Sequence, residues 1–219
     1  MKIVTYIYNK LKNLPTAKVT TPLHTREGLG VGLFILLCLF SCTDDKDDFY
    51  PSIVTELADC PTDAEGRMTG IVLDDDTRLT LSNPQKGLKP SVVYRALVGY
   101  ALEGDGRARL YSATGTPLLR DSTSVATCDP VNVVSLWRTS RYLNLHLMPK
   151  TQGEGEHAWG FITDSIVADH AYLRLHHRQG ADPMAYSTDQ YASLPLDLVP
   201  ATRITLRIET FQGTWEREL

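Results

Sequence analysis

Short segments of alternating apolar and polar residues dominate the chain after residue 50, and helical periodicity is nearly absent there. Alternation with a period of two is typical of strands that bury one face of a sheet. We therefore predict an all-β protein. The first group of predicted strands comprises residues 53–58, 68–73, 78–81, 92–102 and 107–113.

Turn-forming residues separate these strands. Asp74–Thr77 predicts a hairpin tip, because carboxylates and small polar side chains bond the local backbone. Asn83–Pro84 predicts a break in the chain, and Glu103–Gly106 predicts a tight hairpin turn. Gly99 lies inside the longest predicted strand and indicates a bulge or a bend. Five strands with a curled fourth strand favour an OB-type barrel over residues 51–114, although other five-stranded sheets would give the same pattern.

A second group of β segments follows a stretch rich in Gly, Thr, Pro, Ser and Asp. We interpret that stretch, residues 115–129, as a linker. The strands predicted in the remaining part, residues 130–219, are 131–137, 142–148, 158–163, 171–177, 186–196 and 203–211. Six or seven strands joined by short turns predict an antiparallel β-sandwich.

An uncharged apolar run precedes the β region. Residues 28–40 are too few to cross a bilayer, which takes about 20 residues, and they follow a basic stretch, as in a secretory signal peptide. The order Leu39-Phe40-Ser41-Cys42 resembles a lipobox, the bacterial signal in which the cysteine is acylated and the leader is removed. We predict a signal peptide with a long leader over residues 1–41, lipidation of Cys42, and attachment to the membrane through the acyl chains.

An acidic run follows Cys42 within the spacer, residues 42–50. The run contains Asp44, Asp45, Asp47 and Asp48. It resembles a signal for export of lipoproteins to the outer face of the Gram-negative outer membrane. The same composition also produces a solvated, disordered spacer, and the two interpretations are compatible. We predict an outer-membrane lipoprotein that faces the cell exterior, with the periplasmic face as the alternative.

Net charge narrows the range of partners. The chain has 22 basic and 26 acidic residues, and the leader takes away five basic residues and one acidic residue. The mature chain thus keeps 17 and 25, a net charge of about −8. Because nucleic-acid binding depends on Lys and Arg neutralising phosphates, this composition argues against a nucleic-acid partner.

Two cysteines remain in the mature chain besides the acylated one. Cys60 and Cys128 have two open interpretations, a disulfide in an oxidising compartment or two unpaired buried thiols. Sequence supplies no distance between them, so neither interpretation is preferred.

Candidate chemistry is sparse. His176 and His177 are adjacent on a predicted strand and point to opposite faces, so they cannot both reach one ion, and with His146 we interpret them as ordinary structural histidines. The acidic run at residues 74–76 lacks the spacing of an EF-hand and suits a hairpin tip better than a calcium site. We predict no metal site and no cofactor.

Catalytic motifs are equally sparse. Glu103 and Asp105 form a pair of carboxylates, but a glycine-flanked turn is normally exposed and does not shift carboxylate pKa values. The sequence contains no nucleophile elbow and no glycine loop for phosphate. We therefore predict a protein that is not an enzyme, and a secreted hydrolase is the third-ranked interpretation of its function.

Several sequence blocks resemble those of NigD-like lipoproteins, in order and spacing, from about Tyr50 to the end of the chain. The blocks are Tyr50–Ser52, Gly87–Pro90, Tyr94–Arg95, Leu102–Gly106, Leu110–Ser112, Arg141–Leu145, Lys150–Gly153 and Asp182–Tyr186. The resemblance implies an OB-type N-terminal domain followed by a C-terminal β-sandwich. The family name comes from an association with a bacteriocin gene cluster, and no catalytic set is carried over from the family.

Binding is the function that these observations favour. OB barrels and β-sandwiches often bind ligands, and several aromatic residues could supply a stacking surface, although aromatics on alternating strands are more often core residues. These residues are Tyr94, Tyr100, Tyr111, Trp137 and Trp159. The leading prediction is a monomeric, non-catalytic module for an envelope protein or glycan. The alternative is an accessory or protective protein of a bacteriocin system.

Overall fold

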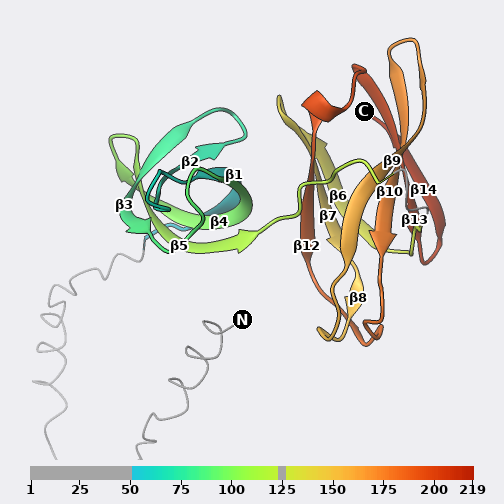
Figure 1. Cartoon of the computed structure of the whole chain (residues 1–219), viewed down its shortest axis with the longest axis horizontal. Coiled ribbons are helices and arrows are strands. Elements are labelled where there is room, and N and C mark those ends of the chain that lie inside the picture. The colour runs from blue at the N-terminus through green and yellow to red at the C-terminus, as the bar shows by residue number, and fades with distance from the viewer. Residues whose placement is uncertain (1–50, 123–126) are drawn as a thin grey trace, which may run out of the picture. The chain divides into compact units, whose positions relative to one another are not determined.

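The computed structural model describes residues 51–122 and 127–219, and the part from Tyr50 to Leu219 forms one compact unit (Figure 1). The predicted signal peptide, the acylated cysteine and the acidic spacer lie outside the described residues. Within the described ranges, no helix is long and apolar enough to cross a membrane. The predicted all-β class is confirmed, since the elements are strands apart from the short 3₁₀ helix η1, Leu196–Leu198.

A closed five-stranded barrel forms the first part. Its strands are β1 (Val54–Pro61), β2 (Met68–Leu73), β3 (Arg78–Gln85), β4 (Val93–Gly104) and β5 (Arg107–Gly115). They are hydrogen-bonded in the order β1-β2-β3-β5-β4, and β4 returns to pair with β1. The short parallel contact between β3 and β5 closes the ring. This arrangement confirms the predicted OB-type barrel.

The long strand β4 makes this closure possible, because it pairs with β1 along one edge and with β5 along the other. Its register with β5 shifts between Gly99 and Tyr100, which confirms the predicted bulge. A Cβ at Gly99 would lie 2.5 Å from the Oγ of Ser112, so a larger residue there requires the Ser112 side chain to move.

The predicted chain break at Asn83–Pro84 is wrong, since β3 continues to Gln85. The Asn83 amide explains why. Its Nδ2 donates to the Leu110 carbonyl at 2.8 Å, and its Oδ1 accepts from the Leu110 amide at 2.9 Å. Pro84 has no amide hydrogen to donate to a neighbouring strand, and the Asn83 side chain supplies hydrogen bonds to β5 beside it.

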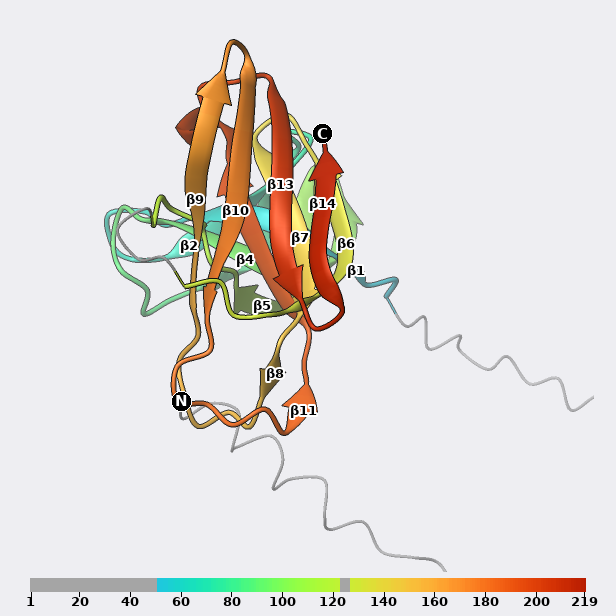
Figure 2. The ribbon, with the colours of Figure 1, turned by 90° about the vertical axis from the view of Figure 1, so that its right-hand side faces the viewer.

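A two-sheet sandwich forms the second part. The strands are β6 (Asn132–Arg138), β7 (Tyr142–Met148), β8 (Lys150–Thr151), β9 (Ala158–Val167), β10 (His170–Arg178), β11 (Tyr186–Ser187), β12 (Gln190–Pro195), β13 (Arg203–Thr210) and β14 (Gly213–Glu218). One sheet has the order β14-β13-β10-β9 (Figure 2). The other has the order β12-β7-β6. Strands β8 and β11 form a small separate ribbon.

The sandwich core lies between the inner faces of the two sheets. The fully buried leucines of β7 and the apolar residues of β10 and β13 meet there, among them Leu143, Leu145, Leu173 and Leu206. The predicted sandwich is confirmed, but β13 runs parallel to β10. The reason is the path of the chain, which leaves β10, crosses to the other sheet as β12, and only then returns as β13.

The segment between barrel and sandwich is packed onto the sandwich. The backbone of Leu118 forms a β-bridge with Ser193 of β12, and that of Asp121 forms one with Phe161 of β9. Residues 116–122 therefore pass from one sheet to the other. Leu119 between these bridges is buried in the sandwich core. The segment that leaves the barrel is therefore held against both sheets of the sandwich.

Candidate functional site

The residues with the firmest sequence assignment, Cys42 and the aspartates of the acidic run, lie outside the described residues. Their roles in lipidation and export stay predictions. The two remaining cysteines are described, and both are free. Cys60 of β1 is buried in the barrel core, whereas the backbone of Cys128 forms an isolated parallel β-bridge with His177 of β10 in the sandwich. The fold therefore does not form the bridge that sequence left open, and burial raises the pKa of the Cys60 thiol to about 11.

The aromatic candidates divide between core and surface. Tyr100 is buried in the barrel, and its hydroxyl donates to Glu56 in a short hydrogen bond. Tyr94 packs against the same core, Trp159 against the sandwich core, and Tyr111 is exposed. Trp137 lines a depression together with residues of the barrel, and Trp159 lines another whose wall includes Gly115 of β5.

A buried charged cluster holds barrel and sandwich together. Arg95 of β4 is 3% exposed and points out of the barrel toward the sandwich. Its Nη1 lies 3.2 Å from Asp59 Oδ1 and 2.7 Å from Asp74 Oδ1. Its Nη2 donates to Asp74 Oδ2 at 2.8 Å. Both carboxylates belong to the barrel and neutralise the guanidinium where it meets the second domain.

Arg95 also bonds the sandwich directly. Its Nη2 donates to Asn144 Oδ1 at 3.1 Å, and its Nε donates to Ser193 Oγ at 3.1 Å. Its guanidinium carbon lies 4.0 Å from the centre of the Tyr142 ring. These partners come from the outer face of the β12-β7-β6 sheet, since Leu143 and Leu145, which alternate with them on β7, face the core.

A second guanidinium from the sandwich reaches the barrel in return. Arg141 Nη1 lies 2.5 Å from Asp59 Oδ2, and its Nη2 donates to the Leu73 carbonyl at 2.8 Å. The Tyr142 hydroxyl donates to the same carboxylate at 3.1 Å, and burial followed by the Asp59 charge raises the pKa of this phenol. Asp59 is thus bonded to three side chains from two domains.

We call this set the junction cluster: Asp59, Asp74, Arg95, Arg141, Tyr142, Asn144 and Ser193. Buried charges are costly unless they are paired, and each of the four charged groups in this cluster lies in an ion pair with another. A single guanidinium that bonds both domains also fixes their orientation, because its donors are planar and directional.

Beside the junction cluster lies a groove lined by both domains. Two adjoining depressions of about 370 Å³ and 560 Å³ share Glu56, Asp74 and Thr139 in their walls. The first is walled on its apolar side by Leu57, Leu97, Trp137 and Tyr191. The second has Asp75 and Asp76 of the β2–β3 turn in its wall. We call both together the junction groove. The predicted hairpin tip at residues 74–77 is confirmed, and it forms the acidic rim of this groove.

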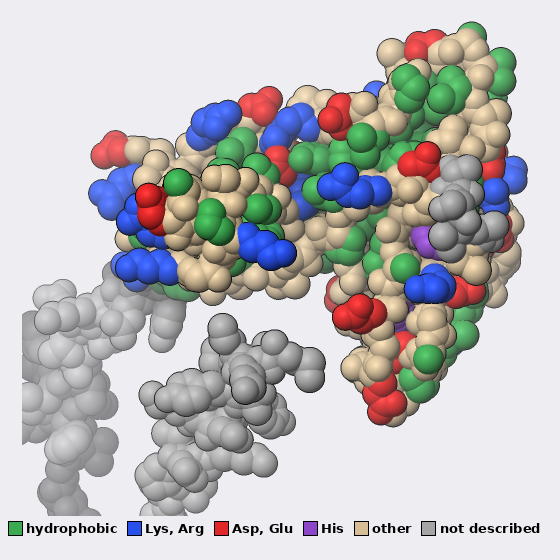
Figure 3. All heavy atoms as spheres, viewed as in Figure 1, with side chains coloured by type: hydrophobic (Ala, Val, Ile, Leu, Met, Phe, Trp, Pro, Cys, Tyr) green, Lys and Arg blue, Asp and Glu red, His purple; other side chains and the backbone are tan. Residues whose placement is uncertain are grey.

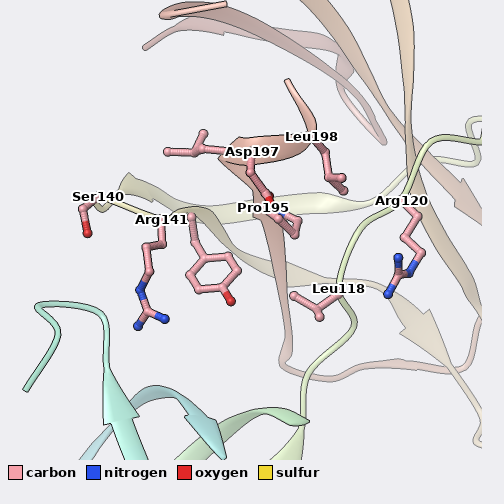
Figure 4. A pocket seen from close by; sticks show the side chains of 9 residues that line it. Leu118, Arg120, Ser140, Arg141, Pro195, Asp197 and Leu198 are labelled. Atoms are coloured by element: carbon pink, nitrogen blue, oxygen red, sulfur yellow. The ribbon is translucent and has the colours of Figure 1, made fainter. Parts of the chain in front are cut away.

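Another depression of about 500 Å³ lies on the sandwich where η1 follows β12. Figure 4 shows Ser140 and Arg141 at one end of it and Arg120 at the other, with Leu118 and Pro195 between them. Arg141 belongs to the junction cluster, and Arg120 and the apolar residues Leu118, Pro195 and Leu196 also line this depression. The face shown in Figure 3 has apolar side chains exposed next to charged ones of both signs.

A second polar centre orders the end of the sandwich near β8 and β11. Asp182 Oδ1 accepts hydrogen bonds from the amides of Gln152 at 3.0 Å and Glu154 at 3.2 Å. Its Oδ2 accepts a short hydrogen bond from the Thr151 hydroxyl and lies 3.1 Å from His157 Nε2. These bonds, that of Thr151 first, hold the pKa of the Asp182 carboxyl well below its usual range.

The histidines of this region form a chain of hydrogen bonds. His177 Nδ1 faces the Asp129 carbonyl at 3.0 Å and must donate to it, so His177 Nε2 is an acceptor. That nitrogen lies 3.0 Å from His157 Nδ1, and His157 Nε2 faces Asp182. Trp159 stacks on His177 with ring centres 4.2 Å apart. Burial lowers the pKa of the His177 imidazole to about 4.

The hydrogen-bonded residues His177, His157 and Asp182 are of the types found in catalytic dyads, but their geometry is not catalytic. A general base needs one ring nitrogen within reach of a substrate proton, and both nitrogens of His157 already face protein groups. His176 bonds the Thr127 carbonyl, and His146 stacks on Tyr191 and faces Asp189. Within residues 51–122 and 127–219, no group of three or more acidic, His or Cys side chains could hold a metal ion.

Sequence reasoning missed the members of the junction cluster. One signal was present, since Arg95 lies within the most apolar strand of the barrel, where an unpaired charge would be costly. The predicted exposed turn at Glu103 and Asp105 is confirmed, and Glu103 pairs with Arg109 at 3.0 Å.

Comparison with known proteins agrees with this architecture. Residues 116–219 match the family model of the NigD-like C-terminal beta sandwich domain. The chain is therefore a two-domain β protein with a NigD-like sandwich. This C-terminal half belongs to the NigD-like family, which confirms the family that the sequence blocks indicated.

Solved structures show the same fold over both domains. A NigD-like immunity protein from Bacteroides caccae is 23% identical with a TM-score of 0.60, over 77% of this chain and 93% of that one. A candidate toxin-related protein from Parabacteroides distasonis is 18% identical with a TM-score of 0.62, over 77% and 92%. A candidate lipoprotein from Bacteroides fragilis is 12% identical with a TM-score of 0.59, over 77% and 97%. No curated protein matches the chain.

Removal of the Arg95 charge should loosen the junction. In Arg95→Met, Asp59 and Asp74 lose a buried partner, and we expect the free energy of unfolding in urea to fall by about 3–5 kcal/mol. The control is Arg109→Met, which breaks an exposed pair with Glu103 and should cost less than about 1 kcal/mol. Equal losses in the two variants would contradict a structural role for the junction cluster.

Acid should weaken the fold through His177. Its side chain is 1% exposed, with Asp129, His157 and His176 around it, and its pKa is about 4 in the fold. The unfolded imidazole takes up its proton near pH 6.5, so stability falls as the pH drops from about 6.5 to 4, by up to roughly 3 kcal/mol. Denaturation in urea across this range should show the slope, and His177→Gln should flatten it. An unchanged slope in the variant would assign the loss to other groups.

Proposed function

We propose that this protein is a lipid-anchored, non-catalytic binding module displayed on the outer face of the outer membrane. The junction groove is the observation that carries the binding function. Its walls come from β1, the β2–β3 turn, β4, β6 and β12, and the junction cluster beside it fixes the two domains that form it. A preformed groove of a few hundred Å³ with both apolar and charged walls is typical of a recognition site.

The rest of the structure supports binding over catalysis. The imidazole nearest to a catalytic arrangement, His157, has both nitrogens facing other protein groups. The anchor is supported by the lipobox-like order that ends at Cys42 and by the likeness in fold to a candidate lipoprotein. Surface display is supported by the aspartates that directly follow the predicted acylation site.

A second candidate function is protection or accessory action in a bacteriocin system. One of the structures with the same fold is described as a NigD-like immunity protein, and this description favours the candidate. A module tethered at the cell surface suits either function, because it would meet a peptide before the peptide reaches the membrane. Deletion of the gene that leaves sensitivity to peptide bacteriocins unchanged would remove this second candidate.

The anchor and its orientation are tested on intact cells. We expect proteinase added outside the cell to degrade the wild-type chain, and Cys42→Ala to abolish acyl labelling and retain the uncleaved leader. Replacement of Asp44, Asp45, Asp47 and Asp48 by alanine should leave acylation intact and protect the chain from external proteinase. A Cys42→Ala chain that is still processed and membrane-bound would refute the anchor.

Binding itself is tested by capture from solubilised envelopes. The immobilised mature chain, residues 42–219, should retain a defined envelope component, and Arg95→Met should retain much less, because the groove walls are no longer held in register. Arg109→Met serves as the control, since Arg109 lies away from the groove lining. Empty eluates from the wild-type chain would count against the binding function.

A further inference from the structure

The charges around the junction groove do not balance. Five carboxylates lie in the groove wall or in the junction cluster, namely Glu56, Asp59, Asp74, Asp75 and Asp76. Two guanidinium groups, those of Arg95 and Arg141, face them. Three negative charges therefore stay uncompensated within the cluster and groove. The most exposed are on Asp75 and Asp76, at the tip of the β2–β3 turn.

The turn that carries these charges is built to hold them in place. Asp75 Oδ1 accepts a hydrogen bond from the Thr77 amide at 2.9 Å, and this bond lowers the pKa of the Asp75 carboxyl. Asp76 adopts a left-handed conformation with φ of 68°, and its Oδ1 lies 3.3 Å from Arg141 Nε. The acidic rim thus contacts the sandwich through the ion pair of Asp76 and Arg141.

Aromatic side chains line the adjoining part of the groove. Trp137 of β6 is 36% exposed, and Tyr191 of β12 stacks on His146 with ring centres 4.3 Å apart. Asp189, whose Oδ1 lies 2.7 Å from His146 Nε2, adds a further carboxylate next to this stack. Aromatic faces attract ammonium and guanidinium groups, and so do carboxylates. Both walls of the groove therefore favour the same kind of ligand.

Other ligand classes fit these walls less well. A neutral sugar would stack on the aromatic wall but gain nothing from the uncompensated charge, and an acidic glycan would be repelled by it. A divalent ion needs several oxygens within about 2.6 Å of one point, and among residues 51–122 and 127–219 no such group of side chains occurs. A basic peptide, whose long side chains have apolar stems and charged ends, gains from both walls.

We propose that the junction groove binds a basic peptide segment, with Lys or Arg side chains placed between the acidic turn and the aromatic wall. This inference rests on the proposed binding function and specifies its partner. The mature chain, with a net charge of about −8, adds long-range attraction for such a partner, and this attraction speeds encounter and weakens with salt.

The test uses the mature chain with Cys42→Ser, which removes the acyl chains and the need for detergent. The probe is a short fluorescein-labelled Gly–Ser peptide that carries several arginines, and its partners are the same peptide with citrulline or with glutamate. We expect fluorescence anisotropy to show saturable binding of the arginine peptide alone. Binding should weaken several-fold as NaCl rises from about 50 mM to 300 mM.

Groove variants locate the site. The first variant is Asp75→Asn/Asp76→Asn. It should fold normally, because an asparagine oxygen also accepts the hydrogen bond from the Thr77 amide and asparagine tolerates the left-handed backbone at position 76. It should bind the arginine peptide about tenfold more weakly. Trp137→Leu removes the aromatic face but keeps an apolar side chain, and should weaken binding about threefold. The charge-matched control Asp105→Asn/Glu156→Gln, at two exposed positions outside the groove, should bind as the unmodified groove does. Thermal unfolding checks that each variant folds.

Some outcomes would overturn the inference. Equal binding of the arginine and citrulline peptides, or an equal loss in the groove variant and its control, would exclude charge recognition in the groove. An envelope component that the groove variant captures as well as the wild type does would also exclude it, while the binding function would stand. Displacement of such a component by an envelope glycan, and not by the arginine peptide, would assign the groove to glycans instead.

Discussion

One buried guanidinium sets the arrangement on which the rest of this structure depends. Arg95 leaves the barrel through β4 and meets carboxylates from its own domain and an amide and a hydroxyl from the other. Loss of a charged partner would leave a buried ion without full compensation, and this is costly. The barrel and the sandwich therefore cannot rotate against each other without leaving a buried ion unpaired. The hydrophobic cores stabilise each domain, and this polar cluster orients one domain on the other.

The groove follows from that constraint. Its acidic rim belongs to a barrel turn and its aromatic wall to a sandwich sheet, so neither domain alone has the site.

The sequence blocks that resemble the NigD-like family also make contacts that hold this structure together. Arg95 and the Arg141–Leu145 block contribute to the junction cluster, and the Lys150–Gly153 and Asp182–Tyr186 blocks meet through the Asp182 side chain and the β8–β11 ribbon. In this chain these blocks hold loops and domains in place, and they take part in no catalytic arrangement that the described residues show.

Local sequence predicted most of the strands. The strands at 68–73 and 142–148 have the predicted limits, and the bulge at Gly99 was read from a single residue. The errors have physical causes. Strand β3 continues through Pro84 because a side-chain amide from Asn83 pairs with Leu110 on another strand, a contact invisible to local propensity. Strand β14 (Gly213–Glu218) was missed because it is a polar edge strand, half of whose residues are charged.

The sequence by itself predicted an export signal, and it determined the all-β class and which face of each strand enters a core, because that class and those faces depend on a period of two. On β7 it distinguished the buried leucines from the polar residues between them, but it could not say what those polar residues face. Tertiary structure decided that Tyr142 and Asn144 meet the barrel, that the two cysteines stay apart, and that an acidic turn and an aromatic wall line one groove. These facts depend on contacts between residues far apart in the chain, which a local sequence pattern does not contain.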